Sequence, residues 1–215
     1  AIVSRFYLLE PRVMSHDETS HVYFSWKLYQ GEGFQHDPMM HGPLQFHLVA
    51  LSFLLFGDND FTARIPAVLF SIATVAFMWN YRRYLGRIGA LIAAVLFLIS
   101  PYMLYYGRYV RNEAFVGLFG VMTLWAVLRY FETGQMRYTM WLSGVMALHF
   151  ITKETSYIYT AQLLLFLGLF FVFRQFRLSG KGNKARPTYP GHQRVRFTKK
   201  QKQYFLLALI GVPVL

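Results

Sequence analysis

The sequence IGALIAAVLFLISPYMLYYG, residues 88–107, decides the class of protein because it contains no Asp, Glu, Lys or Arg. Residues 65–81 and 155–173 are uncharged runs of the same kind. A helix needs about 20 apolar residues to cross the hydrocarbon core of a bilayer, and each run approaches or reaches that length. We therefore expect an all-α, polytopic membrane protein built as a bundle of transmembrane helices.

The composition agrees with a membrane protein. The 215 residues are 55% hydrophobic and 15% charged, whereas a soluble domain is usually about 25% charged. A net charge of +12 would suggest nucleic acid as a partner of a soluble protein. Here the basic residues cluster in alternate loops, as membrane topology requires, so we expect the lipid bilayer and no nucleic acid as partner. The absence of cysteine excludes disulfides and thiolate chemistry.

The apolar runs predict five spans after residue 64, at about 65–81, 88–107, 112–131, 138–153 and 155–173. Residues 42–57 are apolar but too short to span, which indicates a juxtamembrane or re-entrant helix. Residues 21–29 fit a short amphipathic helix at the interface. No signal-peptide pattern begins the chain, and we expect residues 1–14 to be the end of an earlier helix, broken at Pro11.

The loops differ in charge in an alternating way. Loops near residues 82–87 and 129–137 and the tail to residue 202 hold 15 of the 22 basic residues and one of the ten acidic residues. Lys/Arg-rich loops stay cytoplasmic, so the other loops are predicted to lie outside the cell membrane. We expect residues 1–173 to form one transmembrane module, 174–203 a basic cytoplasmic loop, and 204–215 the start of a further helix. That basic loop is either solvated or in contact with anionic headgroups.

The stretch SHDETSHVYFSWKLYQGEGFQHDPMMHGP, residues 15–43, concentrates the ionisable side chains. It holds four of the ten acidic residues and four of the seven histidines. Ionisable groups beside apolar spans are costly unless they are paired or functional. The predicted topology brings twelve candidates to one membrane face: His16, Asp17, Glu18, His36, Asp37, His41, Arg64, Arg108, Arg111, Glu113, Lys153 and Glu154.

The acidic and histidine candidates each allow a structural and a functional interpretation. Ser15 and Glu18 have the spacing of a helix capping box, which would also hold Asp17 rigidly. His36 and His41 are either metal ligands or ordinary hydrogen-bonding loop residues.

The basic candidates also allow two interpretations. Arg108 and Arg111 either snorkel or pair with Glu113, or their guanidinium groups bind phosphate. Lys153 either pairs with Glu154 or adds a third cation to the same phosphate site. Carboxylates beside fixed cations suit a substrate with a lipid-linked phosphate leaving group. The carboxylate would deprotonate an acceptor hydroxyl, and the cations would neutralise the departing phosphate.

These residues also resemble a known family. The chain resembles GT-C membrane glycosyltransferases, in the branch of the protein O-mannosyltransferases and aminoarabinose lipid A transferases, and is most similar to the flippase-activity-associated proteins of archaea and bacteria. The resemblance rests on HDE at 16–18, HDPxxHGPL at 36–44, LFGxxxFxAR at 55–64, SPxxLYYxRxxRNE at 100–113 and TKE at 152–154. It covers about residues 5–160 and implies a GT-C-like fold whose first outer loop carries juxtamembrane helices.

The resemblance implies roles for particular residues. Asp17 matches the catalytic acid of the first outer loop, with Glu18 beside it, and Glu113 matches a second acid, preceded by Arg108. Lys153 matches a lysine on the lipid phosphate, and we expect Arg108, Arg111 and Lys153 together to hold that phosphate. The family's His-Pro-Pro-Leu element is His41-Gly42-Pro43-Leu44 here, with glycine in place of the first proline.

The resemblance also bears on cofactor and reaction. It implies either a site without metal or a divalent metal ion, with candidate ligands Asp17, Glu113, His36 and His41. The expected reaction is transfer of a sugar, with inversion, from a polyprenyl- or dolichyl-phosphate donor to a lipid, glycan or protein acceptor on the non-cytoplasmic face. Asp17 is the expected general base, with Glu18 or Glu113 orienting the acceptor or a metal ion.

Two other functions remain as alternatives. The first is a transporter or lipid-linked-sugar flippase component. A transporter should carry ionisable residues near the middle of its spans, whereas here they lie at the ends and only His149 falls inside a predicted span. The second is a non-catalytic subunit of a glycosylation complex, which would not need paired acids and cations on one face.

Overall fold

The computed structural model describes residues 1–34 and 41–179, with side chains as far as residue 173. Every regular element in those ranges is a helix. In chain order they are α1 (Ile2–Phe6), α2 (His16–Tyr29), α3 (Leu44–Phe56), α4 (Asp60–Phe77), η1 (Met78–Tyr81), α5 (Arg82–Ile99), α6 (Pro101–Tyr106), α7 (Glu113–Thr133), α8 (Met136–Phe150) and α9 (Ser156–Ser179). The predicted all-α class is confirmed.

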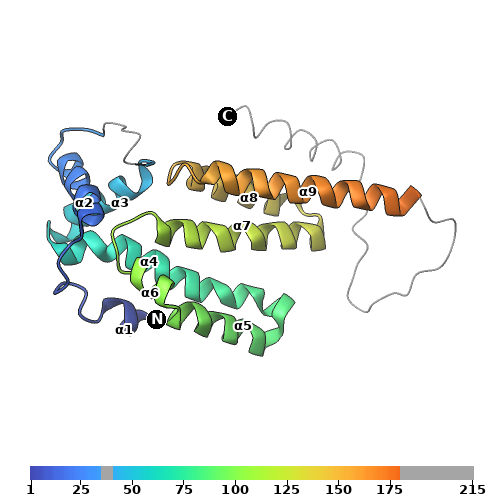
Figure 1. Ribbon diagram of the computed structural model, residues 1–215, viewed down its shortest axis with the longest axis horizontal. Helices are drawn as coiled ribbons and strands as arrows, with labels where there is room; N and C mark the ends of the chain where they lie inside the picture. The colour runs from blue at the N-terminus through green and yellow to red at the C-terminus, as the bar shows by residue number, and fades with distance from the viewer. Residues whose placement is uncertain (35–40, 180–215) are drawn as a thin grey trace.

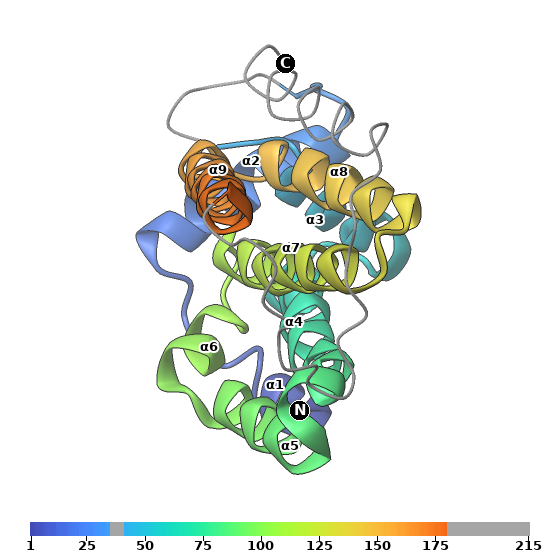
Figure 2. The same cartoon turned by 90° about the vertical axis from the view of Figure 1, so that its right-hand side faces the viewer.

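The long helices lie side by side along one axis, and the short helices α2 and α3 lie across one end of them (Figure 1). Helix α7 is central, because it packs against α4 on one side and α8 on the other, and α9 packs against α8. Figure 2 shows the same bundle end-on, with α5 on the side opposite to α9. Phe115, Phe119 and Val145 form a buried core between α7 and α8.

Three segments of the described chain are long and apolar enough to cross a membrane: Asp60–Ile99, Glu113–Thr133 and Ser156–Phe173. The first contains two helices, because α5 returns beside α4 after η1 and the non-helical Gly86 (φ 73°, ψ 170°) (Figure 1). It therefore covers two of the predicted spans. The predicted span at 138–153 is not confirmed, because α8 has 15 residues.

The predicted span at 88–107 is too long. Helix α5 ends at Ile99, and Ser100 begins a new short helix, α6. Pro101 explains the break, because proline has no N–H to continue α5 but suits the first turn of a helix. Helix α3, between residues 42 and 57, has 13 residues and is too short to span, as predicted. Helix α2 begins at His16, five residues before the predicted start at residue 21.

Among the described residues, the two predicted sets of loops lie at opposite ends of the bundle. Most of the predicted basic loop at 174–203, and the whole of the predicted helix at 204–215, lie outside the described residues. At one end, the N-terminal ends of α2, α3, α7 and α9 converge (Figure 1). At the other end, Arg83 and Arg129 pair with Glu132 beside the turn at Gly134. The first end carries the candidate site.

Candidate functional site

Neighbouring acids on α2 point into different surroundings. Successive residues of a helix are about 100° apart around its axis, so Asp17 and Glu18 cannot face the same partners. The Asp17 side chain is 52% exposed, whereas Glu18 is fully buried. The two carboxylates therefore belong to two separate ionic clusters.

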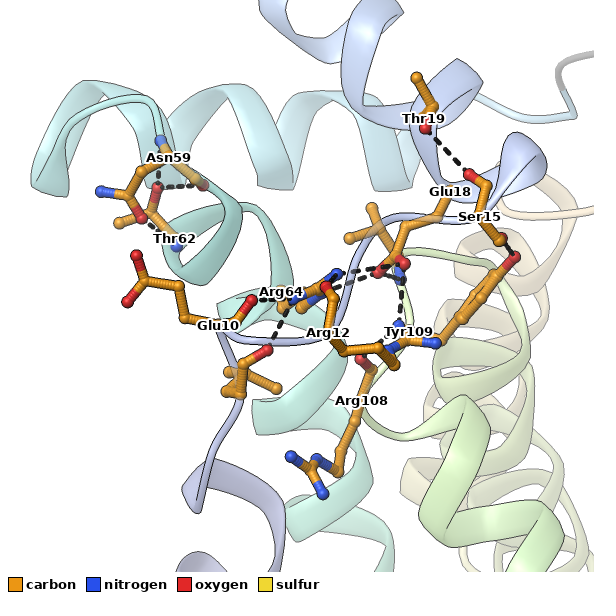
Figure 3. Close-up of polar contacts among 12 residues, drawn as sticks. Glu10, Arg12, Ser15, Glu18, Thr19, Asn59, Thr62, Arg64, Arg108 and Tyr109 are labelled. Carbon is orange, nitrogen blue, oxygen red and sulfur yellow. Dashed lines mark hydrogen bonds and ion pairs between the residues drawn. The ribbon is translucent and has the colours of Figure 1, made fainter.

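The buried cluster consists of Glu18, Arg64 and Arg12 (Figure 3). Arg64 Nε lies 2.9 Å from Glu18 Oε1, and Arg12 donates to Glu18 Oε2 at 2.8 Å. The Val110 amide donates to the same carboxylate at 3.2 Å. Arg64, also fully buried, donates to the carbonyls of Leu9 and Arg12. The charged groups of Glu18 and Arg64 are buried and bonded within the protein, which favours a structural role for these two residues.

The predicted capping box is wrong. Ser15 occupies the N-cap position of α2, but its hydroxyl accepts no hydrogen bond from the helix. It contacts the Tyr109 hydroxyl instead. Glu18 cannot complete the box because its carboxylate is bonded to Arg64 (Figure 3).

The open cluster consists of Asp17, Arg111, Glu113 and Lys153. Arg111 Nη1 lies 3.1 Å from Asp17 Oδ2, and its Nε lies 3.7 Å from Glu113 Oε2. Lys153 Nζ donates to Glu113 Oε1 at 2.7 Å. The residues come from α2, the loop before α7, the start of α7 and the turn before α9. The structure thus brings four of the predicted site residues together at one end of the bundle.

The open cluster is not fully bonded. Arg111 Nε and Glu113 Oε2 are buried and have no hydrogen-bond partner within the described ranges. A buried polar atom without a partner carries a desolvation cost of about 1–3 kcal/mol. Such atoms in a native site call for an explanation, and capacity to bind a ligand is one.

His41 and Glu154 form a second pair beside the open cluster. His41 Nδ1 lies 2.6 Å from Glu154 Oε2. His41 has φ 63°, a left-handed conformation that is uncommon for a non-glycine residue. The predicted pairing of Lys153 with Glu154 is not observed, because Lys153 donates to Glu113 and Glu154 bonds His41.

Backbone contacts fix His41 against the turn between α8 and α9. The Gly42 amide donates to the Thr152 carbonyl at 3.1 Å, and the Leu44 amide donates to the Ile151 carbonyl at 3.0 Å. A Cβ on residue 42 would lie 2.2 Å from the Ile151 carbonyl oxygen. Only glycine fits here, and proline at this position would also lack the N–H that bonds Thr152.

Arg108 lies apart from Arg111. Its Nη2 donates to the carbonyls of Tyr7 and Leu8, at 2.6 and 2.7 Å. Burial, together with the nearby charges of Arg12 and Arg64, lowers the pKa of Arg108. Its guanidinium therefore holds the N-terminal segment, and the two arginines do not form one phosphate clamp in this structure.

The sequence-based reasoning missed His21. This residue follows Asp17 by one helical turn and is 7% exposed. Its ring stacks on His41 with centroids 6.1 Å apart. Burial, and then the charges of His41 and Arg111, lower the pKa of His21 to about 4, against the opposing effects of Glu113 and Asp17. The i, i+4 spacing from Asp17 was the signal that would have identified it.

The remaining metal candidates do not converge in the described part of the chain. No group of three His, Asp or Glu side chains placed to hold a metal occurs there. The guanidinium of Arg111 lies between Asp17 and Glu113, where a bridging cation would have to be. His36 and Asp37 lie outside the described residues, and the His16 side chain is 97% exposed.

Fold and site together define an integral membrane protein with an ionic site where the N-terminal ends of four helices meet. The chain belongs to the dolichyl-phosphate-mannose-protein mannosyltransferase family, whose model matches residues 40–180, more than half of its length. The matched region includes Arg111, Glu113 and Lys153 and begins after α2. No curated protein and no solved structure matched the chain. It is therefore a membrane glycosyltransferase of a family that uses a dolichyl-phosphate-linked sugar donor.

Proposed function

We propose that the described chain carries the transfer site of this glycosyltransferase, and that it moves a sugar from a polyprenyl- or dolichyl-phosphate donor to an acceptor hydroxyl on the non-cytoplasmic face. The observation that supports this proposal is the open cluster. It places an exposed carboxylate within 3.1 Å of a guanidinium and a lysine within 2.7 Å of a second carboxylate. Transfer from a phosphate needs this combination of a base and fixed cations.

In the proposed reaction, Asp17 takes the proton of the acceptor hydroxyl as the oxygen forms a bond with the anomeric carbon. The bond from that carbon to the phosphate oxygen breaks, and its electron pair leaves with the lipid phosphate. Direct displacement of this kind inverts the anomeric centre. The exposure of Asp17 supports its assignment as the base, because the acceptor must reach the carboxylate.

Arg111 and Lys153 stabilise the charge on the leaving phosphate in this proposal. Arg111 Nε is a donor without a hydrogen-bond partner in the described chain. The ammonium group of Lys153 has three N–H donors, so it can keep its bond to Glu113 and bind phosphate as well. Helices α7 and α9 begin beside these two residues, so the partial positive charges of their dipoles also favour an anion there.

Glu113 is proposed to hold the two cations rather than to react. Its carboxylate lies between Lys153 and Arg111, and its side chain is 15% exposed. Glu18, Arg64 and Arg108 are assigned no contact with substrate, because their charged groups are bonded within the protein. No step of the proposal uses a metal ion.

The test uses the full-length protein in membrane vesicles with radiolabelled polyprenyl-phosphate hexoses, mannose first. Asp17→Asn should lower the transfer rate by at least about a thousandfold, and Lys153→Met by about a hundredfold. Asp60→Asn is the matched control, because Asp60 is an exposed carboxylate in the first turn of α4. Transfer that survives Asp17→Asn would overturn the assignment of the base. Movement of the donor between leaflets without transfer by the wild type would favour a transport function instead.

A further inference from the structure

His21 is a buried ionisable residue of the site that has no role in the proposed reaction. Its ring lies between His41, at 6.1 Å, and Phe46, at 5.5 Å. Asp17 lies one turn earlier on α2, and successive turns place these two side chains on the same face of the helix. His21 is therefore next to the proposed base without being bonded to it.

The Nδ1 atom of His21 is buried and has no hydrogen-bond partner among the residues that the structure describes. A phenylalanine ring would fill the same space and make the same stacking contacts without that cost. Packing alone therefore gives no reason for a histidine at this position. An imidazole nitrogen forms one hydrogen bond that a phenyl ring cannot form.

We propose that His21 is a further positioning residue for glycosyl transfer, whose Nδ1 forms a hydrogen bond with a substrate hydroxyl while its ring holds His41. The inference rests on the proposed function. The hydroxyl belongs either to the transferred sugar or to the acceptor, and both offer the same hydrogen-bonding chemistry. Through this bond His21 orients the hydroxyl-bearing group relative to Asp17, and through stacking it fixes His41 on Glu154.

The experiment compares the full-length wild type with His21→Phe and His21→Asn. Phenylalanine keeps the ring and removes the nitrogen, whereas asparagine keeps a polar atom near the position of Nδ1. Loss of one neutral hydrogen bond corresponds to about a tenfold loss of kcat/KM. We expect that loss in His21→Phe, and recovery to within about threefold of the wild type in His21→Asn.

Two readouts separate positioning from a structural role. The melting temperature of His21→Phe should equal or exceed that of the wild type, because a buried polar atom without a partner has been removed. A higher KM for the acceptor would assign the hydroxyl to the acceptor, and a higher KM for the lipid-linked sugar would assign it to the donor. His47→Phe is the control, because His47 is exposed on α3 and its Nδ1 bonds the Pro43 carbonyl.

The outcomes are distinct. Wild-type kinetics in His21→Phe, or a His21→Asn variant no better than His21→Phe, would overturn the role of His21 alone. A melting temperature of His21→Phe that falls in step with its activity would also overturn it, because the ring would then be only structural. Absence of transfer by the wild type would overturn the proposed function, and the role of His21 in transfer with it.

Discussion

The buried cluster and the open cluster contain the same kinds of side chain but have different roles. Glu18 is fully buried and accepts hydrogen bonds from Arg64, Arg12 and the Val110 amide. Asp17, one residue earlier, is half exposed and has one arginine within 3.1 Å. In the buried cluster the charged groups of Glu18 and Arg64 are fully buried and bonded within the protein, so the cluster holds elements together. In the open cluster, bonding capacity is left over for a ligand, and this difference separates a structural ion pair from a candidate site.

Breaking the buried cluster should have the largest effect on stability. Removing one partner of a buried ion pair leaves an uncompensated charge and costs about 3–5 kcal/mol. We expect Glu18→Gln and Arg64→Met each to lower the free energy of unfolding by that amount, measured by denaturation in detergent. Asp17→Asn, by contrast, should change it by less than about 1 kcal/mol.

A double variant sharpens this prediction. Glu18→Gln combined with Arg64→Met removes both charges of the fully buried pair, so neither is left uncompensated, and the third member, Arg12, is 37% exposed. The double variant should therefore be more stable than either single variant. If the losses simply add, the two side chains do not act as a pair.

The pH dependence of stability should report on His21. Its folded pKa of about 4 lies below the ordinary value of 6.5, so between these values the unfolded chain binds more protons. The free energy of unfolding should therefore fall as the pH drops from 6.5 to 4, by at most about 3 kcal/mol. In His21→Phe this component should vanish, and in His47→Phe it should persist. Equal slopes in the wild type and His21→Phe would refute the pKa assignment.

Gly42→Ala should distort the attachment of His41 to the turn before α9. The added Cβ would meet the Ile151 carbonyl oxygen, and overpacking of this kind costs about 1–3 kcal/mol. Gly144→Ala is the control, because a Cβ there meets open space in the middle of α8. That change should stabilise the helix by up to about 1 kcal/mol. Thermal unfolding of both variants tests the contrast, and equal losses would contradict it.

The smallest effect is expected at the far end of the bundle. Glu132 pairs there with Arg83 and Arg129, and its side chain is 24% exposed. Glu132→Gln should cost less than about 1 kcal/mol, since partly exposed ion pairs contribute little. Its transfer rate should equal that of the wild type. A large loss of transfer would mean that the two ends of the bundle are coupled.

Much of the fold could be predicted from the sequence. The long apolar runs predict the helices α4, α5, α7 and α9, because such segments have few other structures available in a bilayer. The helix boundaries were less predictable. The end of α5 at Ile99 depends on Pro101, and the reversal between α4 and α5 depends on a glycine with φ 73°. Neither feature changes the hydropathy of the run.

The candidate site could be predicted only in outline. Charge patterning predicted Asp17, Arg111, Glu113 and Lys153 on one face together with eight other candidates, and the structure joins these four in one cluster. The pattern could not separate Asp17 from Glu18 or Arg111 from Arg108, because that depends on which way each side chain points. A rotation of one residue on α2 decides whether a carboxylate meets Arg64 or Arg111. His21 was missed because a histidine inside an amphipathic segment looks like part of its polar face.

The two backbone hydrogen bonds that join Gly42 and Leu44 to the turn after α8 have a consequence for how the chain tolerates changes in length. One residue inserted between Ile151 and Lys153 would shift the lysine relative to both bonds and to Glu113. The number of residues between the end of α8 and Lys153 is therefore fixed by the contacts that assemble the site.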